Sequence, residues 1–148
     1  MYTRIVIALD GSQRGEAALK EGAALAAALN IPVHLVEVAD VTLVRFGAPE
    51  AAMDYAQLSD EMQQEQDEAS TYLARIAADL RAQGLTVTAE VRSGFAAHGI
   101  LSATRPGDLL VMASHGRSGP VRWLLGSVAE EVTRHAEVPV LLVRATEG

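Results

Sequence analysis

The feature that most constrains the fold is an alternation of short apolar runs with helical segments along the whole chain. RIVIAL (4–9), VHLVEV (33–38), LLVMA (109–113) and VPVLLV (138–143) are largely apolar runs, which are typical of strands buried on both faces of a parallel sheet. LTVTAEV (85–91) alternates apolar and polar residues, which indicates a strand closer to solvent. We therefore predict five strands.

Helical patterns fill the intervals between these strands. They predict helices over 12–30, with Ser12 as the N-cap, over about 55–82, over 95–104 and over about 127–136. In the first, Ala18, Gly22, Leu25 and Leu29 fall on one face. The second has an apolar stripe of Met62, Ala69, Leu73, Ile76 and Leu80.

Strand followed by helix, repeated four times and ended by a fifth strand, implies parallel strands and an α/β layered fold. The handedness of the crossovers predicts an open, doubly wound five-stranded sheet flanked by helices. Residues 39–54 have no sustained period and are predicted to form a loop or lid. With 148 residues and no internal repeat or low-complexity segment, the chain is expected to be a single domain over 1–148.

Composition narrows the classes of function. The net charge of −7, without a dense run of Lys and Arg, argues against nucleic acid as a partner. The absence of cysteine excludes disulfides and thiolate chemistry, and the four histidines lack metal-ligand spacing. The beginning, MYTRIVIALDGS, does not resemble a signal peptide, and no apolar run approaches a membrane span. We expect a cytoplasmic protein without membrane association.

Two strand ends carry residues suited to ligand binding. Asp10-Gly11-Ser12 follows the first strand and Ser114-His115-Gly116 follows the fourth, and a helix begins beyond each. Ligands of open α/β sheets bind at the carboxyl ends of the strands, where helix N-termini favour anions. The phosphate motifs GxxxxGK[ST] and GxGxxG are both absent, so the local pattern indicates an anion site without naming its ligand.

Each of these features also has a purely structural interpretation. Residues 127–130, Ser-Val-Ala-Glu, match a capping box, in which serine and glutamate satisfy the donors of their own helix. Asp10 is equally a turn former with the glycine after it. His115 is either a phosphate donor or, as we favour, an exposed loop residue, and Arg117 either screens phosphates or is a solvated surface residue.

Three segments together resemble the universal stress protein family: VIALDGS at the start, ASHGRSGPVRWLLGS near the end, and a closing PVLLV. The similarity covers the whole chain. Nucleotide-binding members of that family carry a glycine, two residues, a second glycine, nine residues, and then Gly-Ser or Gly-Thr. Gly116 matches the second glycine and Gly126-Ser127 match the end, whereas Ala113 stands in place of the first glycine.

The resemblance implies a Rossmann-like fold of the adenine nucleotide alpha hydrolase type that binds ATP or AMP, with or without Mg²⁺. It places Asp10 against the ribose or adenine, Val38 and Met112 beside the adenine, and the Ser127 hydroxyl with neighbouring backbone against ribose and phosphates. The nucleotide-binding residues implied are Ala8, Leu9, Asp10, Val38, Met112, Ala113, Gly116, Arg117, Gly126, Ser127 and Val128.

The implied protein is a homodimeric stress-response regulator. No activated nucleophile or evident carboxylate base is present, so at most slow ATP hydrolysis is expected. The alternative is a dimeric interaction module of the same fold that has lost nucleotide binding; the intact Gly116, Gly126 and Ser127 favour binding. The dimer is predicted to form through Val138–Val143, a strand expected at a sheet edge, where Pro139 cannot donate a hydrogen bond.

Overall fold

The strands form one sheet of five parallel strands in the order β3-β2-β1-β4-β5, which confirms the predicted open, doubly wound arrangement. The computed structural model describes residues 1–40, 55–115 and 125–144. The strands are β1 Arg4–Leu9, β2 Val33–Asp40, β3 Val87–Gly94, β4 Asp108–Ala113 and β5 Val140–Val143. The helices are α1 Gly15–Leu29, α3 Tyr55–Ala82, α4 Ala96–Ser102 and α5 Ser127–His135.

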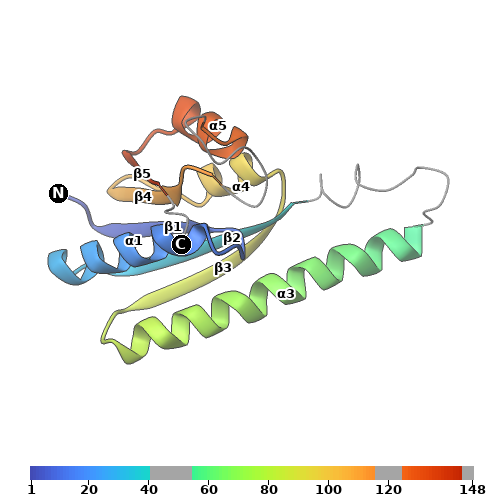
Figure 1. Ribbon diagram of the computed structural model, residues 1–148, viewed down its shortest axis with the longest axis horizontal. Helices are drawn as coiled ribbons and strands as arrows, with labels where there is room; N and C mark the ends of the chain where they lie inside the picture. The colour runs from blue at the N-terminus through green and yellow to red at the C-terminus, as the bar shows by residue number, and fades with distance from the viewer. Residues whose placement is uncertain (41–54, 116–124, 145–148) are drawn as a thin grey trace.

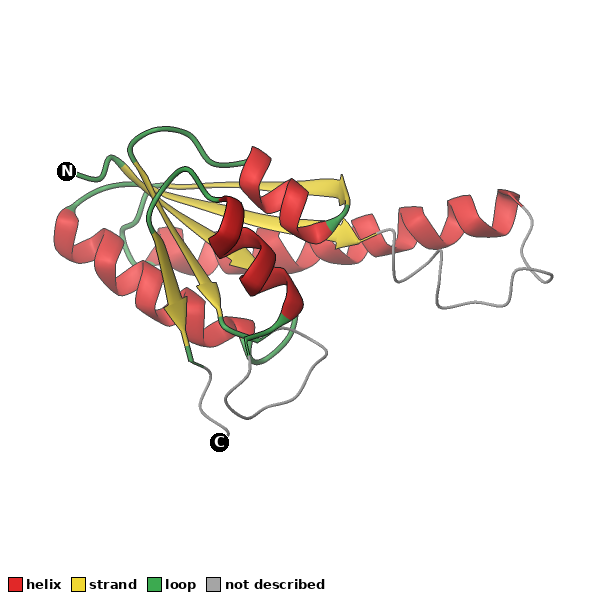
Figure 2. Cartoon of the chain, turned by 90° about the horizontal axis from the view of Figure 1, so that it is seen from above, coloured by secondary structure: helices red, strands yellow, loops and turns green. Residues whose placement is uncertain are grey.

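The sheet is the middle of three layers. Helices α1 and α3 cover one face, and α4 and α5 cover the other (Figures 1 and 2). Because successive side chains of a strand point to opposite faces, β1 divides between the two: Ile5, Ile7 and Leu9 belong to the apolar cluster on the α1/α3 face, and Val6 and Ala8 to the cluster on the α4/α5 face.

Two buried glycines set how closely the helices approach the sheet. A Cβ at Gly22 of α1 would lie 2.6 Å from Ile7 Cδ1, and a Cβ at Gly99 of α4 would lie 2.6 Å from Val38 Cγ2. Both distances are too short for carbon atoms in contact. Each helix therefore packs against its strand more closely than a larger residue would permit.

The long helix was predicted with the correct bounds, and its buried stripe is Ala69, Leu73, Ile76 and Leu80. Met62, which we placed in the same stripe, is only half-buried. Gln66 donates a hydrogen bond to the Ser93 hydroxyl near the end of β3. The residues of α3 before this point extend past the sheet, as Figures 1 and 2 show.

The start of α1 differs from the prediction. The helix begins at Gly15 with Arg14 as its N-cap residue, so the predicted start at Ser12 is wrong, although the Ser12 hydroxyl still accepts the Gly15 N–H at 3.3 Å, as a capping serine would. The Asp10 carboxylate competes for the Ser12 backbone N–H at 2.9 Å and also accepts from the Ser12 hydroxyl, which holds these residues in a turn ahead of the helix. Of the residues predicted to share one face of this helix, Ala18 and Gly22 are buried, whereas Leu29, in the last helical turn, is 40% exposed.

The bounds of several strands also differ from the prediction. β2 and β3 run further than predicted, since their ladder continues through Ala39–Ser93 and Asp40–Gly94. The predicted loop over 39–54 therefore loses its first two residues to β2, and 41–54 lie outside the described residues. β5 begins at Val140 because Pro139 has no N–H to donate, although its carbonyl accepts from the Leu110 N–H at 3.0 Å.

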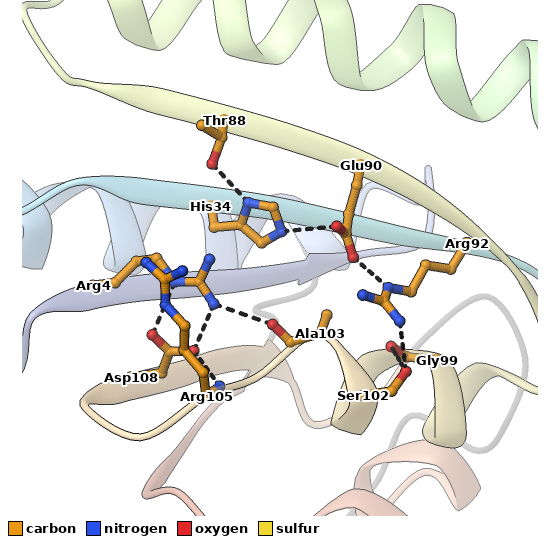
Figure 3. A network of polar contacts seen from close by, with 10 residues as sticks. All are labelled: Arg4, His34, Thr88, Glu90, Arg92, Gly99, Ser102, Ala103, Arg105 and Asp108. Carbon is orange, nitrogen blue, oxygen red and sulfur yellow. Dashed lines mark hydrogen bonds and ion pairs between the residues drawn. The ribbon is translucent and has the colours of Figure 1, made fainter.

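A buried ion pair joins the amino-terminal ends of β1 and β4 (Figure 3). Arg4 donates from Nε to Asp108 Oδ1 at 2.9 Å and from Nη2 to Oδ2 at 2.7 Å. The Asp108 side chain is fully buried. Burial alone would raise the pKa of Asp108, but the Arg4 guanidinium and the Arg105 backbone N–H outweigh it, so the pKa lies below its ordinary value.

A second polar group lies beside this pair on the α4/α5 face, toward β3 (Figure 3). His34 Nδ1 lies 2.7 Å from the Thr88 hydroxyl, and Nε2 lies 3.5 Å from Glu90 Oε2. Burial and the nearby Arg4 charge lower the pKa of His34, partly opposed by Glu90. Burial raises the pKa of Glu90, yet hydrogen bonding to the Arg92 guanidinium brings it below its usual value.

Among the described residues no helix combines the length and apolarity needed to cross a membrane; even the 28-residue α3 is rich in charged and polar side chains.

Candidate functional site

The winding of the sheet reverses between β1 and β4, and their carboxyl ends therefore define the expected ligand position. The chain passes from β1 toward β2 and β3 on one side and then returns to β4 and β5 on the other (Figure 1). Asp10 follows β1 directly, and Ser114 and His115 follow β4. The two marked strand ends of the sequence thus meet at the reversal.

The nucleotide-binding residues predicted on the strands divide between the two faces of the sheet. Ala8, Val38 and Met112 belong to the apolar cluster on the α4/α5 face, and Ala8 pairs in register with Met112. Leu9 and Ala113 belong to the cluster on the α1/α3 face. Leu9 and Ala113 can therefore offer only backbone atoms to a ligand on the α4/α5 face.

Asp10 performs the structural role that its sequence context indicated. Its Oδ1 accepts from the Ser12 backbone, and Gly11 has the positive φ of 80° that the turn requires. A Cβ at Gly15 would lie 3.2 Å from the same Oδ1, so α1 also begins close to this carboxylate. The interpretation as a turn former is confirmed, and contact with ligand stays a prediction.

The N-terminus of α5 lies beside the end of β4. The Gly126 N–H donates to the Ser114 carbonyl at 2.8 Å, and the Gly126 carbonyl accepts the first helical bond, from the Glu130 N–H at 2.9 Å. Gly126, and not Ser127, is the N-cap residue, and no side chain caps this helix. The capping-box interpretation is therefore wrong, since that motif needs the serine at the N-cap.

The consequence is a set of backbone donors without a helical acceptor. The N–H groups of Ser127, Val128 and Ala129 precede the first helical hydrogen bond and so have no carbonyl four residues earlier within the helix. Gly126 is buried, with φ −65° and ψ 155°, a conformation open to any residue. A glycine is therefore not required at this position by the backbone conformation.

His115 is not the exposed loop residue that we favoured. The side chain is half-buried, its Nδ1 lies 3.3 Å from the Ser114 hydroxyl, and its Nε2 is shielded from solvent. Within the described part of the chain Nε2 has no hydrogen-bond partner. The candidate residues Gly116 and Arg117 lie outside the described residues.

Sequence analysis missed a buried carboxylate on the opposite face. Glu37 is 4% exposed and lies in register with Leu9, and a Cβ at Gly11 would lie 3.8 Å from its Oε2. The sequence did contain a signal for this residue, because Glu37 is the one acidic residue within the largely apolar run 33–38. Burial raises the pKa of the nearby Tyr72, as do the charges of Glu16, Glu37 and Asp10.

The described residues contain no group of three or more acidic or histidine side chains that could hold a metal ion.

The all-parallel sheet, its strand order and the helices on both faces define an α/β domain of the adenine nucleotide alpha hydrolase-like fold. The model of the universal stress protein family matches residues 1–144. The chain is 32% identical over 146 residues to the universal stress protein MJ0531 of Methanocaldococcus jannaschii, covering 97% of this chain and 83% of that protein. The chain therefore belongs to the universal stress protein family.

Solved structures agree with this assignment. The hypothetical protein MJ0577 is 25% identical and superimposes with a TM-score of 0.85, over 100% of this chain and 99% of the other. A universal stress protein solved with cAMP has a TM-score of 0.70 at 23% identity, over 98% and 99% of the two chains. One from Archaeoglobus fulgidus solved with dAMP has a TM-score of 0.61 at 19% identity, over 96% and 98%. At these identities the last two show the fold alone.

Proposed function

We propose that this protein binds an adenine nucleotide, ATP or AMP, at the carboxyl edge of the sheet between β1 and β4, and acts as a stress-response regulator. The observation that carries the proposal is the uncapped N-terminus of α5, held against the end of β4 by the hydrogen bond from Gly126 to Ser114. Free backbone donors and the positive end of the helix dipole at a strand-order reversal are suited to phosphate.

Residues near this helix terminus fit the rest of a nucleotide. Ala8, Val38 and Met112 give the α4/α5 face an apolar floor at the ends of three adjacent strands, which suits a planar base. Asp10 lies at the reversal, where a carboxylate can accept from ribose or adenine. The universal stress proteins that were solved with cAMP and dAMP add support, because both ligands are adenine nucleotides.

The same residues argue for binding without rapid turnover. The Asp10 carboxylate already accepts hydrogen bonds from the Ser12 backbone N–H and hydroxyl. Activation of water for attack on a phosphate normally needs a positioned base or a metal ion. We therefore propose at most slow hydrolysis of ATP, with nucleotide occupancy as the regulatory signal.

Gly126→Val tests the binding site. A β-branched side chain is compatible with the extended backbone of Gly126 but would fill the space in front of the α5 donors, so ATP affinity should fall by about 100-fold or more. Ala136→Val is the matched control, because Ala136 ends the same helix with a similar φ of −66° and ψ of 137°. Calorimetric titration with ATP and AMP measures both variants, and melting temperatures verify the fold. Equal ATP affinity in Gly126→Val and the native protein would remove the assignment of this site.

We further propose that β5 forms a homodimer by antiparallel pairing with its copy. Within the described residues β5 pairs with β4 alone and so lies at the edge of the sheet, where Leu141 is 36% exposed. An apolar edge without a charge invites pairing, and a two-fold pairing closes on itself.

Leu141→Lys should convert a dimer into a monomer in sedimentation velocity at micromolar concentration. Leu29→Lys is the control, since Leu29 is 40% exposed, much like Leu141, but lies in the last turn of α1 and not on the strand β5. Native protein that sediments as a monomer would contradict the dimer, and dissociation by both variants would contradict the choice of β5.

A further inference from the structure

His115 carries a polar atom whose burial nothing in the fold explains. Its Nε2 is shielded from solvent and lacks a hydrogen-bond partner in the described part of the chain. A buried donor or acceptor without a partner costs free energy, so such atoms are uncommon and call for a specific reason. The proposed function has so far made no use of this ring.

The position of His115 is fixed by the residue before it. Ser114 donates its N–H to the Val143 carbonyl at 2.9 Å and accepts the Gly126 N–H on its own carbonyl at 2.8 Å. Ser114 is therefore held between the end of β5 and the N-cap of α5. Since consecutive Cα atoms lie about 3.8 Å apart, His115 is confined to the vicinity of the α5 N-terminus.

The contact with Ser114 also bears on the chemistry of Nε2. Nδ1 lies 3.3 Å from the Ser114 hydroxyl. When that hydroxyl donates to Nδ1, the neutral ring carries its proton on Nε2, which is then a donor. Nε2 is also a donor when the ring is protonated. A partner for this atom must then be an acceptor, and phosphate oxygens are strong acceptors.

We propose that the His115 Nε2–H donates to the phosphate chain of the bound nucleotide, and that this contact makes the site prefer nucleotides with several phosphates. This inference rests on the proposed function. The N-terminus of α5 supplies donors for one phosphate group, and His115 supplies a further donor close by. ATP has phosphate oxygens that can accept from this donor, whereas adenosine has none. The buried nitrogen gains its hydrogen bond when nucleotide enters.

Two substitutions distinguish the contributions of the two ring nitrogens of His115. His115→Asn retains a polar atom near the position of Nδ1 and loses the one at Nε2, whereas His115→Gln places an amide N–H near Nε2. We expect His115→Asn to weaken ATP binding by about tenfold or more and adenosine binding by little, and His115→Gln to retain most of the ATP affinity. Calorimetry with adenosine, AMP and ATP measures all three forms.

The outcomes are distinct. If the native protein binds neither ATP nor AMP, the proposed function fails. If it binds ATP and His115→Asn binds ATP equally well, only the role of His115 fails. Equal losses for ATP and adenosine, or equal losses in the two variants, would also overturn that role. In the native protein, the ¹⁵N shift of His115 Nε2 should change on addition of ATP but not of adenosine, which tests the contact even if a variant does not fold.

Discussion

The two ends of the α4/α5 face are built from the same strands and differ in chemistry. At their amino ends β1, β2 and β4 carry Arg4, His34 and Asp108, which are buried and satisfied by one another and by β3 (Figure 3). At their carboxyl ends the same strands carry the apolar Ala8, Val38 and Met112.

At the carboxyl end, the first N–H groups of α5 have no acceptor within their own helix, and His115 Nε2 has no hydrogen-bond partner among the described residues. A polar group satisfied within the fold contributes to stability, whereas one left for a ligand contributes to binding. The contrast agrees with a stabilising role for the amino end and with the nucleotide binding that we propose at the carboxyl end.

The largest effect is expected from Asp108→Ala at the amino end. Removing one partner of a buried ion pair leaves the Arg4 charge uncompensated, which costs about 3–5 kcal/mol of unfolding free energy. Nucleotide affinity should stay within about threefold of native, because the carboxyl end is unchanged. Urea denaturation and ATP titration measure the two quantities.

Arg134→Ala is the control for this change. Arg134 and Glu130 form an ion pair with the same 2.7 Å separation, but their side chains are 68% and 56% exposed. An exposed pair of this kind contributes about 0.5 kcal/mol. If Asp108→Ala costs no more than Arg134→Ala, the amino end does not have the stabilising role that we assign to it.

The next largest effect is expected from alanine at Gly22 or Gly99, the two helix glycines that pack equally closely against strand side chains. Alanine at Gly22 would press on Ile7, and alanine at Gly99 would press on Val38, with each Cβ 2.6 Å from a side-chain carbon. Overpacking costs about 1–3 kcal/mol, offset in both cases by up to about 1 kcal/mol from the higher helix propensity of alanine.

The two variants should lose similar stability but differ in binding. Gly99→Ala displaces Val38 at the proposed adenine position, so we expect weaker ATP binding, by about fivefold, with Gly22→Ala close to native. Melting curves and calorimetry test this pair. If both variants bind ATP equally well, Val38 does not contact the base.

These contrasts show how far the sequence alone could go. Hydrophobic periodicity predicted the five strands, the parallel order and the bounds of β1 and α3, because a buried parallel sheet imposes local patterns. It missed the start of α1, where the Asp10 carboxylate competes for the Ser12 N–H. It also extended the last strand into Pro139.

The sequence could predict where on the sheet the candidate site lies. It could not predict which buried polar groups find partners within the fold and which do not. Strand ends and the family motif located Asp10, Met112 and Gly126. The pairing of Arg4 with Asp108, 104 residues away, has no local signal, because only the register of β1 with β4 brings the two together. The buried Nε2 of His115 depends in the same way on how Ser114 is held between β5 and α5.

A smaller effect concerns Ala113, where the family motif has a glycine. Its side chain packs in the apolar cluster on the α1/α3 face, away from the proposed ligand. Ala113→Gly should therefore leave ATP affinity within about twofold while lowering stability by about 1 kcal/mol, through the loss of a buried methyl group and the entropy of glycine in a strand. An increase in ATP affinity of tenfold would show that the methyl group crowds the ligand after all.

The smallest effect is a pH dependence at the amino end, due to His34. Burial and the Arg4 charge lower the pKa of this histidine below 6.5, with Thr88, Glu90 and Asp108 also around it. The unfolded chain then binds a proton at a higher pH than the folded protein does, so stability falls as the pH drops below about 6.5. The carboxyl groups of Asp108 and Glu90 have lowered pKa values, so their contribution to stability is lost only in more acidic solution.

The melting temperature of the native protein should therefore decrease between about pH 7.5 and pH 5.5. This decrease should be smaller in His34→Gln. The control is His98→Gln, at an exposed position on α4, which should follow the native protein. A native pH dependence that survives unchanged in His34→Gln would show that the amino end is insensitive to protonation of this ring.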